Sequence, residues 1–345
     1  MPTNPITSEG IMAVIAAGKE DEKALAFVYG SESKIELGCY SVAKLSGGHT
    51  VSIDEPETMP GGKNLGPNPL EVMCGSFGTC QEITYKMYAT VMGIDLKSVA
   101  CTVEGDIDLA GFVGLKDKTG FTSISATIAL DTDAPDEQLE QLKTAVDAHC
   151  PLAATFSESC PLETTITQVT NPAKPDLSED PVKAADILGV IGAGKEDENA
   201  LKMKYGSSSK LADSGLMTKV DMGGHSLTVD EPETMPGGSN QGPNPLDLFC
   251  ASFGSCQEIS YKYYAAVMDV PVNSVSCKVT APCDLRGLVG LSDKVGLASI
   301  KGEITIDSPA GEEAIAQLKG AVDAKCPMVD TIKSPVAVTT KWVRA

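Results

Sequence analysis

Two long stretches of the chain carry apolar residues at the spacing of one helix face. The pattern fills 69–92 and returns almost unchanged in 245–268, and it predicts two long helices. Asn68 and Asn244 stand directly before them, where a side-chain oxygen can cap the first helical N–H groups. Each helix begins with proline, which needs no N–H partner there. The periodic positions of the first stretch are Leu70, Met73, Phe77, Thr84, Met87 and Val91.

The two stretches belong to a tandem duplication of a whole domain. An offset of 176 residues separates Cys80 from Cys256 and Cys150 from Cys326, and it relates two further cysteine pairs as well. A constant offset without gaps indicates that one unit occurs twice. The joint between the units is rich in proline and charged residues, as exposed linkers are. We predict copy 1 over 1–170, a proline-rich linker over 171–181 and copy 2 over 182–345.

Segments in which apolar and polar residues alternate surround each long helix and predict strands. In copy 1 they are 24–30, 34–45 and 49–54 before the helix, and 98–109 and 121–130 after it. A short opening helix over 11–17, a second helix over 136–150 and a last strand over 164–169 complete the copy. This order of elements predicts an α+β fold with antiparallel sheet, rather than a doubly wound α/β fold.

The composition of the chain argues against some kinds of binding partner and indicates its cellular compartment. The chain has 27 basic and 47 acidic residues and a formal net charge of −20, which argues against nucleic-acid and anionic membrane partners. No apolar run approaches the ~18 residues of a membrane span, and the first ten residues lack the basic region of a secretory signal. Eleven cysteines, an odd number, indicate free thiols rather than a disulfide scaffold. These features predict a cytoplasmic protein.

Most of the cysteines are better explained by packing than by chemistry. The cysteines of the predicted strands alternate with valines and point towards a core. In each long helix, a second cysteine stands six positions before the mid-helix cysteine and lies about 120° away from it around the helix. Three more have no counterpart in the other copy, so a duplicated mechanism would not need them. These groups are Cys101 and Cys277, Cys74 and Cys250, and Cys39, Cys160 and Cys283. No metal-ligand spacing and no phosphate-binding glycine motif occurs, so neither a metal nor a cofactor is predicted.

Four cysteines remain as candidates for chemistry: Cys80 with Cys150, and Cys256 with Cys326. Cys150 and Cys326 each precede proline, so each is expected at a helix N-cap, where N–H groups and the helix dipole stabilise a thiolate. If the fold brings the two members of a pair together, one thiol can attack and the other resolve. The alternative is that all four are buried cysteines at packing positions, and the residues alone favour this alternative over a redox pair.

The same residues form a pattern that resembles the OsmC/Ohr family. Its parts are an Asn-Pro pair, a cysteine eleven residues after that proline, a downstream Tyr-Ala pair and a later, isolated Cys-Pro pair. The resemblance covers essentially all of both copies. It implies intertwined homodimers in which two long central helices are wrapped by antiparallel sheets, with the sites at the subunit interface. In a duplicated chain, the implied arrangement is an intramolecular pseudo-dimer.

The resemblance also implies an activity, since characterised members are thiol-dependent peroxidases that reduce organic hydroperoxides. Cys80 and Cys256 match the attacking cysteine of the family, and Cys150 and Cys326 match the resolving cysteine. The partners implied are an organic or lipid hydroperoxide as substrate and a dithiol reductant of the lipoyl or thioredoxin type. No cofactor is implied.

Two departures from the family pattern concern the activation of the thiol. Characterised members place a glutamate directly after Asn-Pro, where it holds an arginine; here Leu70 and Leu246 take those positions, and the arginine has no match. Lys34 and Lys210 are the cations that could replace it, although lysine lacks the planar fork of arginine. Without a cation, we expect a raised thiol pKa and slow peroxide reduction that accelerates from pH 7 towards 9.

These departures keep a second interpretation open, in which the domain binds a small apolar molecule and the cysteines are structural. The pocket expected for it is lined by Met73, Phe77 and Phe253. Retention of both cysteine pairs in both copies favours the peroxidase, and the missing arginine and glutamate favour the binding module.

Overall fold

The computed structural model describes residues 5–35, 37–169, 180–211 and 215–345. Within these ranges, helices and strands follow one another in the same order in the two copies. The predicted linker, 171–181, lies outside the described residues except for its last two positions.

Eight helices form among the described residues, four in each half of the chain. Asn68 caps α2 through hydrogen bonds from the N–H groups of Leu70 and Glu71, and Asn244 caps α6 in a similar way. The predicted caps and the prolines at the first helical position are therefore confirmed. The helices are α1 (Ser8–Glu20), α2 (Pro69–Met92), α3 (Asp136–His149), α4 (Pro151–Ser157), α5 (Ala184–Glu196), α6 (Pro245–Val267), α7 (Glu312–Lys325) and α8 (Pro327–Lys333).

Twelve strands of the described chain form two six-stranded sheets, in the orders β3-β2-β1-β10-β11-β6 and β12-β5-β4-β7-β8-β9. The single strand predicted over 34–45 is wrong, because Gly38, with φ of 67°, lies in a turn between β1 and β2. The strands are β1 (Ala26–Ile35), β2 (Ser41–Leu45), β3 (Thr50–Ile53), β4 (Ser98–Asp108), β5 (Phe121–Asp131), β6 (Leu162–Val169), β7 (Lys202–Leu211), β8 (Thr218–Met222), β9 (His225–Val229), β10 (Ser274–Asp284), β11 (Ile300–Asp307) and β12 (Ala337–Arg344).

Each sheet is continuous across the two copies. Strand β1 of copy 1 pairs antiparallel with β10 of copy 2, from Ala26 opposite Asp284 to Ile35 opposite Val275. Strand β4 of copy 1 pairs with β7 of copy 2 in the same sense. At one edge of each sheet the pairing is parallel instead, between β6 and β11 and between β12 and β5. The α+β class and the pseudo-dimer are thus confirmed, with a parallel edge added to each antiparallel sheet.

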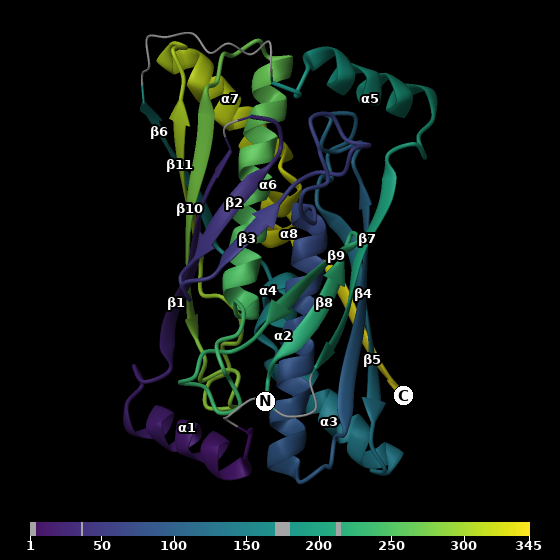
Figure 1. Ribbon diagram of the computed structural model, residues 1–345, viewed down its shortest axis with the longest axis vertical. Helices are drawn as coiled ribbons and strands as arrows, with labels where there is room; N and C mark the ends of the chain where they lie inside the picture. The colour runs from purple at the N-terminus through teal and green to yellow at the C-terminus, as the bar shows by residue number, and fades with distance from the viewer. Residues whose placement is uncertain (1–4, 36, 170–179, 212–214) are drawn as a thin grey trace.

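The two long helices pack against each other between the sheets. Figure 1 shows α2 and α6 in the middle of the molecule, with one sheet on either side. Small residues let strands of both copies approach α2 closely. A Cβ added at Gly75 would lie 2.2 Å from Met222 Sδ of β8, and one at Gly78 would lie 3.2 Å from Val103 of β4. The small residues near Cys80 therefore make room for sheet side chains.

A buried glutamate on each central helix binds serines from strands of the other copy. Glu258 of α6 accepts hydrogen bonds from Ser33 Oγ at 2.8 Å and Ser41 Oγ at 2.6 Å, and from the N–H of Cys277 at 2.9 Å. Glu82 of α2 accepts one from a serine of β7 at 2.8 Å. Burial raises the pKa of Glu258 to about 8 and raises that of Glu82 as well, because a buried carboxylate loses the solvation of its charge.

Candidate functional site

The fold brings the candidate cysteines together in pairs within each copy. Cys80 Sγ on α2 lies 3.5 Å from Cys150 Sγ, and Cys256 Sγ on α6 lies 3.4 Å from Cys326 Sγ. All four thiols are free and buried. A sulfur–sulfur separation of this size is a contact between two thiols, which a small movement would close to the ~2.05 Å of a disulfide.

The junction between two helices positions the second cysteine of each pair. In copy 1, α3 ends at His149 and α4 begins at Pro151, so that Cys150 is the N-cap of α4, as predicted. The backbone N–H groups of Leu152 and Ala153 face its sulfur and help to lower its pKa, although its side chain makes no cap hydrogen bond. Proline at the first helical position fixes the backbone direction there without losing a hydrogen bond. The junction of α7 and α8 places Cys326 in the same way.

The two thiols of a pair differ in acidity. Burial raises the pKa of Cys150, but the hydrogen bond from Cys80 and the N–H groups of Ala153 and Leu152 outweigh burial and lower that pKa below its ordinary value. The hydrogen bond to Cys150 and burial together raise the pKa of Cys80. The first ionisation belongs to the pair, in which the two sulfurs share one proton, and the N–H groups beside Cys150 favour its sulfur as the thiolate. Cys326 and Cys256 differ in the same directions.

Solvent reaches the central-helix cysteine of each pair, which is the member with the raised pKa. Cys80 and Cys256 are 6% exposed, whereas Cys150 and Cys326 are fully buried. Cys80 lines a cavity of about 30 Å³, and Cys256 lines a second one of similar size. A small molecule that enters either cavity therefore meets the central-helix cysteine first.

Both copies contribute to the wall of each cavity. The wall beside Cys80 includes Tyr29, Ile83, Thr84, Met87 and Pro151 from copy 1 and Glu231, Met235, Leu246, Leu285 and Leu288 from copy 2. The wall beside Cys256 includes Tyr205, Ile259, Ser260, Tyr263 and Pro327 from copy 2 and Glu55, Met59, Leu70, Leu109 and Phe112 from copy 1. Each candidate site is thus complete only when the two copies are assembled.

The lysines proposed as replacement cations do not face the thiols. Lys34 of β1 and Lys210 of β7 are exposed, because strand alternation turns them away from the buried serines beside them. Of the described residues, no lysine or arginine lines either cavity. Lys34 and Lys210, which the sequence left possible as replacement cations, therefore line neither cavity. Leu70 and Leu246 do line the cavities, each beside the cysteine of the opposite copy.

The pocket expected for an apolar ligand also differs from the structure. Met73, Phe77 and Phe253 are fully buried in the core, and Phe77 stacks edge-on against Phe156 with ring centroids 5.6 Å apart. None of the three lines a thiol cavity. They belong to the packing between the helices and the sheets, which spacing on one helix cannot distinguish from a pocket wall.

The remaining cysteines are all buried, as predicted for those on the strands and the long helices. Cys101 and Cys277 lie in β4 and β10, and the helix cysteines Cys74 and Cys250 are fully enclosed. The three unmatched cysteines donate to backbone carbonyls: Cys39 to Pro60, Cys160 to Leu297 and Cys283 to Gly296.

Sequence reasoning missed one carboxyl group in each cavity, Glu231 beside Cys80 and Glu55 beside Cys256. Both are the second residue of the repeated turn Asp-Glu-Pro-Glu-Thr-Met-Pro-Gly-Gly. Burial and the neighbouring carboxylates Asp230 and Asp247 raise the pKa of Glu231 to about 8. The identical turn in both copies could have pointed to these glutamates, but acidic residues in a turn are equally typical of a solvated loop.

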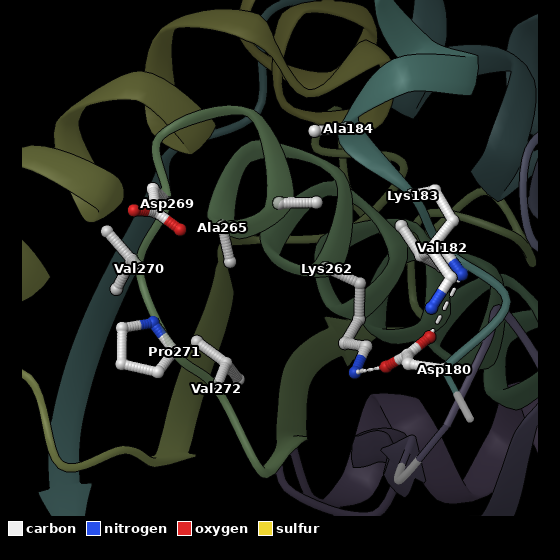
Figure 2. Close-up of a pocket in the computed structure, with 11 residues that line it drawn as sticks. Asp180, Val182, Lys183, Ala184, Lys262, Ala265, Asp269, Val270, Pro271 and Val272 are labelled. Carbon is white, nitrogen blue, oxygen red and sulfur yellow. Dashed lines mark hydrogen bonds and ion pairs between the residues drawn. The ribbon is translucent and has the colours of Figure 1, made fainter. Parts of the chain in front are cut away.

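A separate cavity of about 200 Å³ lies at the C-terminal end of α6. Figure 2 shows Lys262 pointing at Asp180 at its wall, and the two charged atoms are 2.5 Å apart. Both side chains are 4% exposed. No cysteine lines this cavity, so it is distinct from the thiol pairs.

The part of the chain that the structure describes contains neither a metal-binding cluster nor a membrane-spanning helix. No three of its His, Cys, Asp and Glu side chains are grouped in a way that would hold a metal ion. None of its helices combines the length and the apolar character needed to cross a membrane.

Comparisons with known proteins give one family. The family model of the OsmC-like protein matches residues 61–165 and 238–341, one region in each copy. No curated protein matches. An OsmC-like protein of Mycoplasma pneumoniae is similar in structure, at 21% identity over 41% of this chain and 98% of its own, with a TM-score of 0.33.

A second similar structure comes from Psychrobacter arcticus 273-4 and is described as an osmotic-stress-induced and detoxification-response protein. It is 17% identical over 36% of this chain and 84% of its own, with a TM-score of 0.31. The two family matches together span more than half of the sequence and fall at corresponding positions of the two copies. The chain belongs to the OsmC-like family and carries its domain twice in tandem.

Proposed function

We propose that the chain is a cysteine-based thiol peroxidase that reduces organic hydroperoxides, including lipid hydroperoxides, in defence against oxidative stress. The observation that carries the proposal is the contact between the two sulfurs of each pair, 3.5 Å and 3.4 Å, beside an apolar cavity. Two thiols at this distance suit a cycle in which one is oxidised and the other condenses with it.

In this cycle Cys80 attacks and Cys150 resolves. The Cys150 thiolate first takes the proton of Cys80, to which it is hydrogen-bonded. The Cys80 sulfur then attacks the terminal oxygen of the hydroperoxide, the O–O bond breaks, and a sulfenic acid and an alcohol form once the leaving alkoxide is protonated. Cys150 condenses with the sulfenic acid to give a disulfide and water. Cys256 and Cys326 repeat the cycle in copy 2.

A dithiol of the lipoyl or thioredoxin type is the proposed reductant, since the disulfide must be reopened by thiol exchange. The cycle needs no bound cofactor. All eleven cysteines are free thiols, which is consistent with a reducing compartment such as the cytoplasm.

Rapid-mixing kinetics of the reduced protein with an organic hydroperoxide test the proposal. Cys80→Ser together with Cys256→Ser abolishes peroxide reduction, because both attacking sulfurs are lost, while either change alone leaves about half of it if the copies act independently. Cys74→Ser with Cys250→Ser is the matched control, since these cysteines lie on the same helices but line neither cavity. A double Cys80/Cys256 variant that consumes peroxide at the parent rate would rule the proposal out.

The missing cation favours a second candidate, a non-catalytic module that binds a small apolar molecule. No described lysine or arginine lines either cavity, and a wall built mainly of apolar side chains suits an apolar ligand. Thiol titration before and after stoichiometric cumene hydroperoxide separates the two functions. A peroxidase loses two titratable thiols for each hydroperoxide consumed, whereas a binding module loses none.

A further inference from the structure

The two cavities each contain a carboxyl group that comes from the copy opposite to the thiols. Glu231 is the second residue of the turn that follows β9 of copy 2, and it lines the cavity of Cys80. Glu55 occupies the same place after β3 of copy 1 and lines the cavity of Cys256. The cycle described above assigns no role to either carboxyl group, although each belongs to the same small cavity as the attacking sulfur.

The turn that carries Glu231 is organised around the aspartate before it. Asp230 is buried, and its carboxylate accepts hydrogen bonds from the N–H groups of Glu231 at 2.9 Å, Ser239 at 3.1 Å and Gln241 at 3.0 Å. The carbonyl oxygen of Glu231 accepts a hydrogen bond from the N–H of Asn240. The backbone of Glu231 is therefore held at both ends, and its side chain is directed to the cavity by the fold of the turn.

Glu55 is held by the same construction in copy 1. The Asp54 carboxylate accepts hydrogen bonds from the N–H groups of Glu55 at 2.9 Å, Lys63 at 3.1 Å and Leu65 at 3.1 Å. A repeated arrangement of this detail, at both sites, favours a common role for the two glutamates over incidental burial.

We propose that Glu231 and Glu55 are proton donors to the leaving oxygen of the hydroperoxide, each serving the thiol pair of the opposite copy. The proposal rests on the proposed peroxidase function. Cleavage of the O–O bond by sulfur releases an alkoxide, a strong base that leaves readily only when it is protonated. No described lysine or arginine lines either cavity, and burial raises the pKa of the tyrosines that do, so these carboxyl groups are the strongest acids in the two walls.

The electrostatic surroundings keep Glu231 protonated near neutral pH. Burial raises its pKa to about 8, and Asp230 in its own turn and Asp247 of α6 contribute to the rise. Tyr29 of β1 and Cys80 of α2 also face it, and its charge would raise the pKa of both. A carboxyl group in such a site is a neutral acid that can give up a proton in the reaction.

Glu55 has corresponding neighbours. Burial raises its pKa to about 8, and the carboxylates of Glu71 and Asp54 contribute. Its charge would raise the pKa of Tyr205, Tyr263 and Cys39 and that of Cys256. Both cavities thus combine a protonated acid with a thiol from the other half of the chain.

The proton balance of one turnover closes with these groups. Cys80 transfers its proton to the Cys150 thiolate and attacks the terminal peroxide oxygen, and the O–O electron pair moves to the alkoxide oxygen. Glu231 gives its proton to that oxygen, so that an alcohol leaves and Glu231 becomes a carboxylate. Cys150 then condenses with the Cys80 sulfenic acid to form a disulfide and water, and solvent returns a proton to Glu231.

The experiment compares two oxidants on the full-length variant Glu231→Gln with Glu55→Gln. Glutamine keeps the size and the hydrogen-bonding capacity of the side chain but cannot transfer a proton. With tert-butyl hydroperoxide at pH 7, the oxidation rate falls by about 100-fold, a typical loss for general acid catalysis. With peracetic acid the rate changes by less than about twofold, because acetate leaves without protonation.

The dependence on pH gives an independent readout of the same role. The thiols alone predict acceleration from pH 7 towards 9, but the proton-donor role predicts the opposite. The parent loses activity towards tert-butyl hydroperoxide as pH rises through about 8, where Glu231 and Glu55 lose their protons. The glutamine variant lacks this alkaline fall. Single-site variants test whether each glutamate serves the thiol pair of the opposite copy. Glu231→Gln should slow peroxide reduction by Cys80 in a Cys256→Ser background, and Glu55→Gln should slow reduction by Cys256 in a Cys80→Ser background.

Glu57→Gln with Glu233→Gln is the matched control, since these glutamates are exposed in the same two turns. An equal loss of rate with both oxidants, or no loss with either, would overturn the proton-donor role while leaving the peroxidase intact. A failure of the peroxidase itself is recognised separately, because the Cys80 and Cys256 serine variants would then keep the parent rate with both oxidants.

Discussion

A reactive cysteine usually combines access to substrate with a lowered thiol pKa, but here Cys80 has the access and Cys150 has the lowered pKa. Cys80 borders the cavity, whereas Cys150 is sealed and receives the N–H groups that lower its pKa. The sequence predicted the N-cap of Cys150 from the proline that follows it. The pairing with Cys80 was implied by the family resemblance and not by the residues alone, because that contact depends on how α3 and α4 dock on α2. Lys34 does not supply the cation that the sequence left possible, because strand alternation turns its side chain outward.

Replacing the buried member of each pair should trap the intermediate. In Cys150→Ser with Cys326→Ser, Cys80 and Cys256 have no thiol with which to condense, so their sulfenic acids persist after reaction with peroxide. Intact-protein mass spectrometry should show a gain of one oxygen at each, and a dimedone adduct should form. We also expect a slower first step, because serine does not accept the proton as a thiolate does. Recovery of a Cys80 disulfide with any other cysteine would contradict the assigned pairing.

At the scale of elements, the periodic pattern predicted α2 and α6 well, including their caps, because helix signals are local. Strand partners were not predictable from the pattern. The serines at 33 and 41 are ordinary strand residues in sequence, yet both bind Glu258 of the other copy. That placement requires β1 to pair with β10 across the copies. Buried polar contacts of this kind depend on the assembled fold, and no single segment contains them.

The buried glutamate of α6 predicts a dependence of stability on pH. The folded-state pKa of Glu258, about 8, lies above the unfolded value of 4.5, so the folded protein holds a proton that the unfolded chain has lost. Its contribution is fully present below pH 4.5 and is lost as pH rises towards 8, by about 1.4 kcal/mol per pH unit in that window. Stability to urea should therefore fall between pH 5 and 8, and Glu258→Gln should reduce the slope.

Other buried carboxyls contribute slopes of the same sign, notably Glu231 and Glu55, so the glutamine variant should flatten the profile only in part. Glu163→Gln, on an exposed position of β6, is the control. If the slope of the Glu258 variant equals that of the parent, the carboxyl is not protonated in the folded protein.

At the scale of the molecule, the duplication places two interleaved halves on one chain. The offset of 176 residues indicated a duplicated domain, the family resemblance implied a pseudo-dimer, and the mixed sheets confirm the pseudo-dimer. The composite cavities add a functional reason for keeping the halves together, because Cys80 and Glu231 come from different copies. Sequence periodicity cannot show this, since it is equally compatible with two domains that fold separately.

Separating the halves is the test at this scale. Each half alone lacks the partner strands of its own β1 and β4, or of β7 and β10, and exposes the apolar face of its central helix. Cutting between 171 and 179 after folding should leave the complex intact, because the sheets and the α2–α6 contact do not depend on the linker.

Each half expressed by itself should be insoluble or should pair with a second copy of itself, since unpaired strand edges and apolar faces drive association. Sedimentation velocity and circular dichroism would report the mass and the folded content of the soluble fraction. A linker also raises the effective concentration of the halves, so co-expressed halves should reassemble less completely on dilution than the intact chain. A monomeric half with native secondary structure would contradict the interleaved fold and, with it, any site built from both copies.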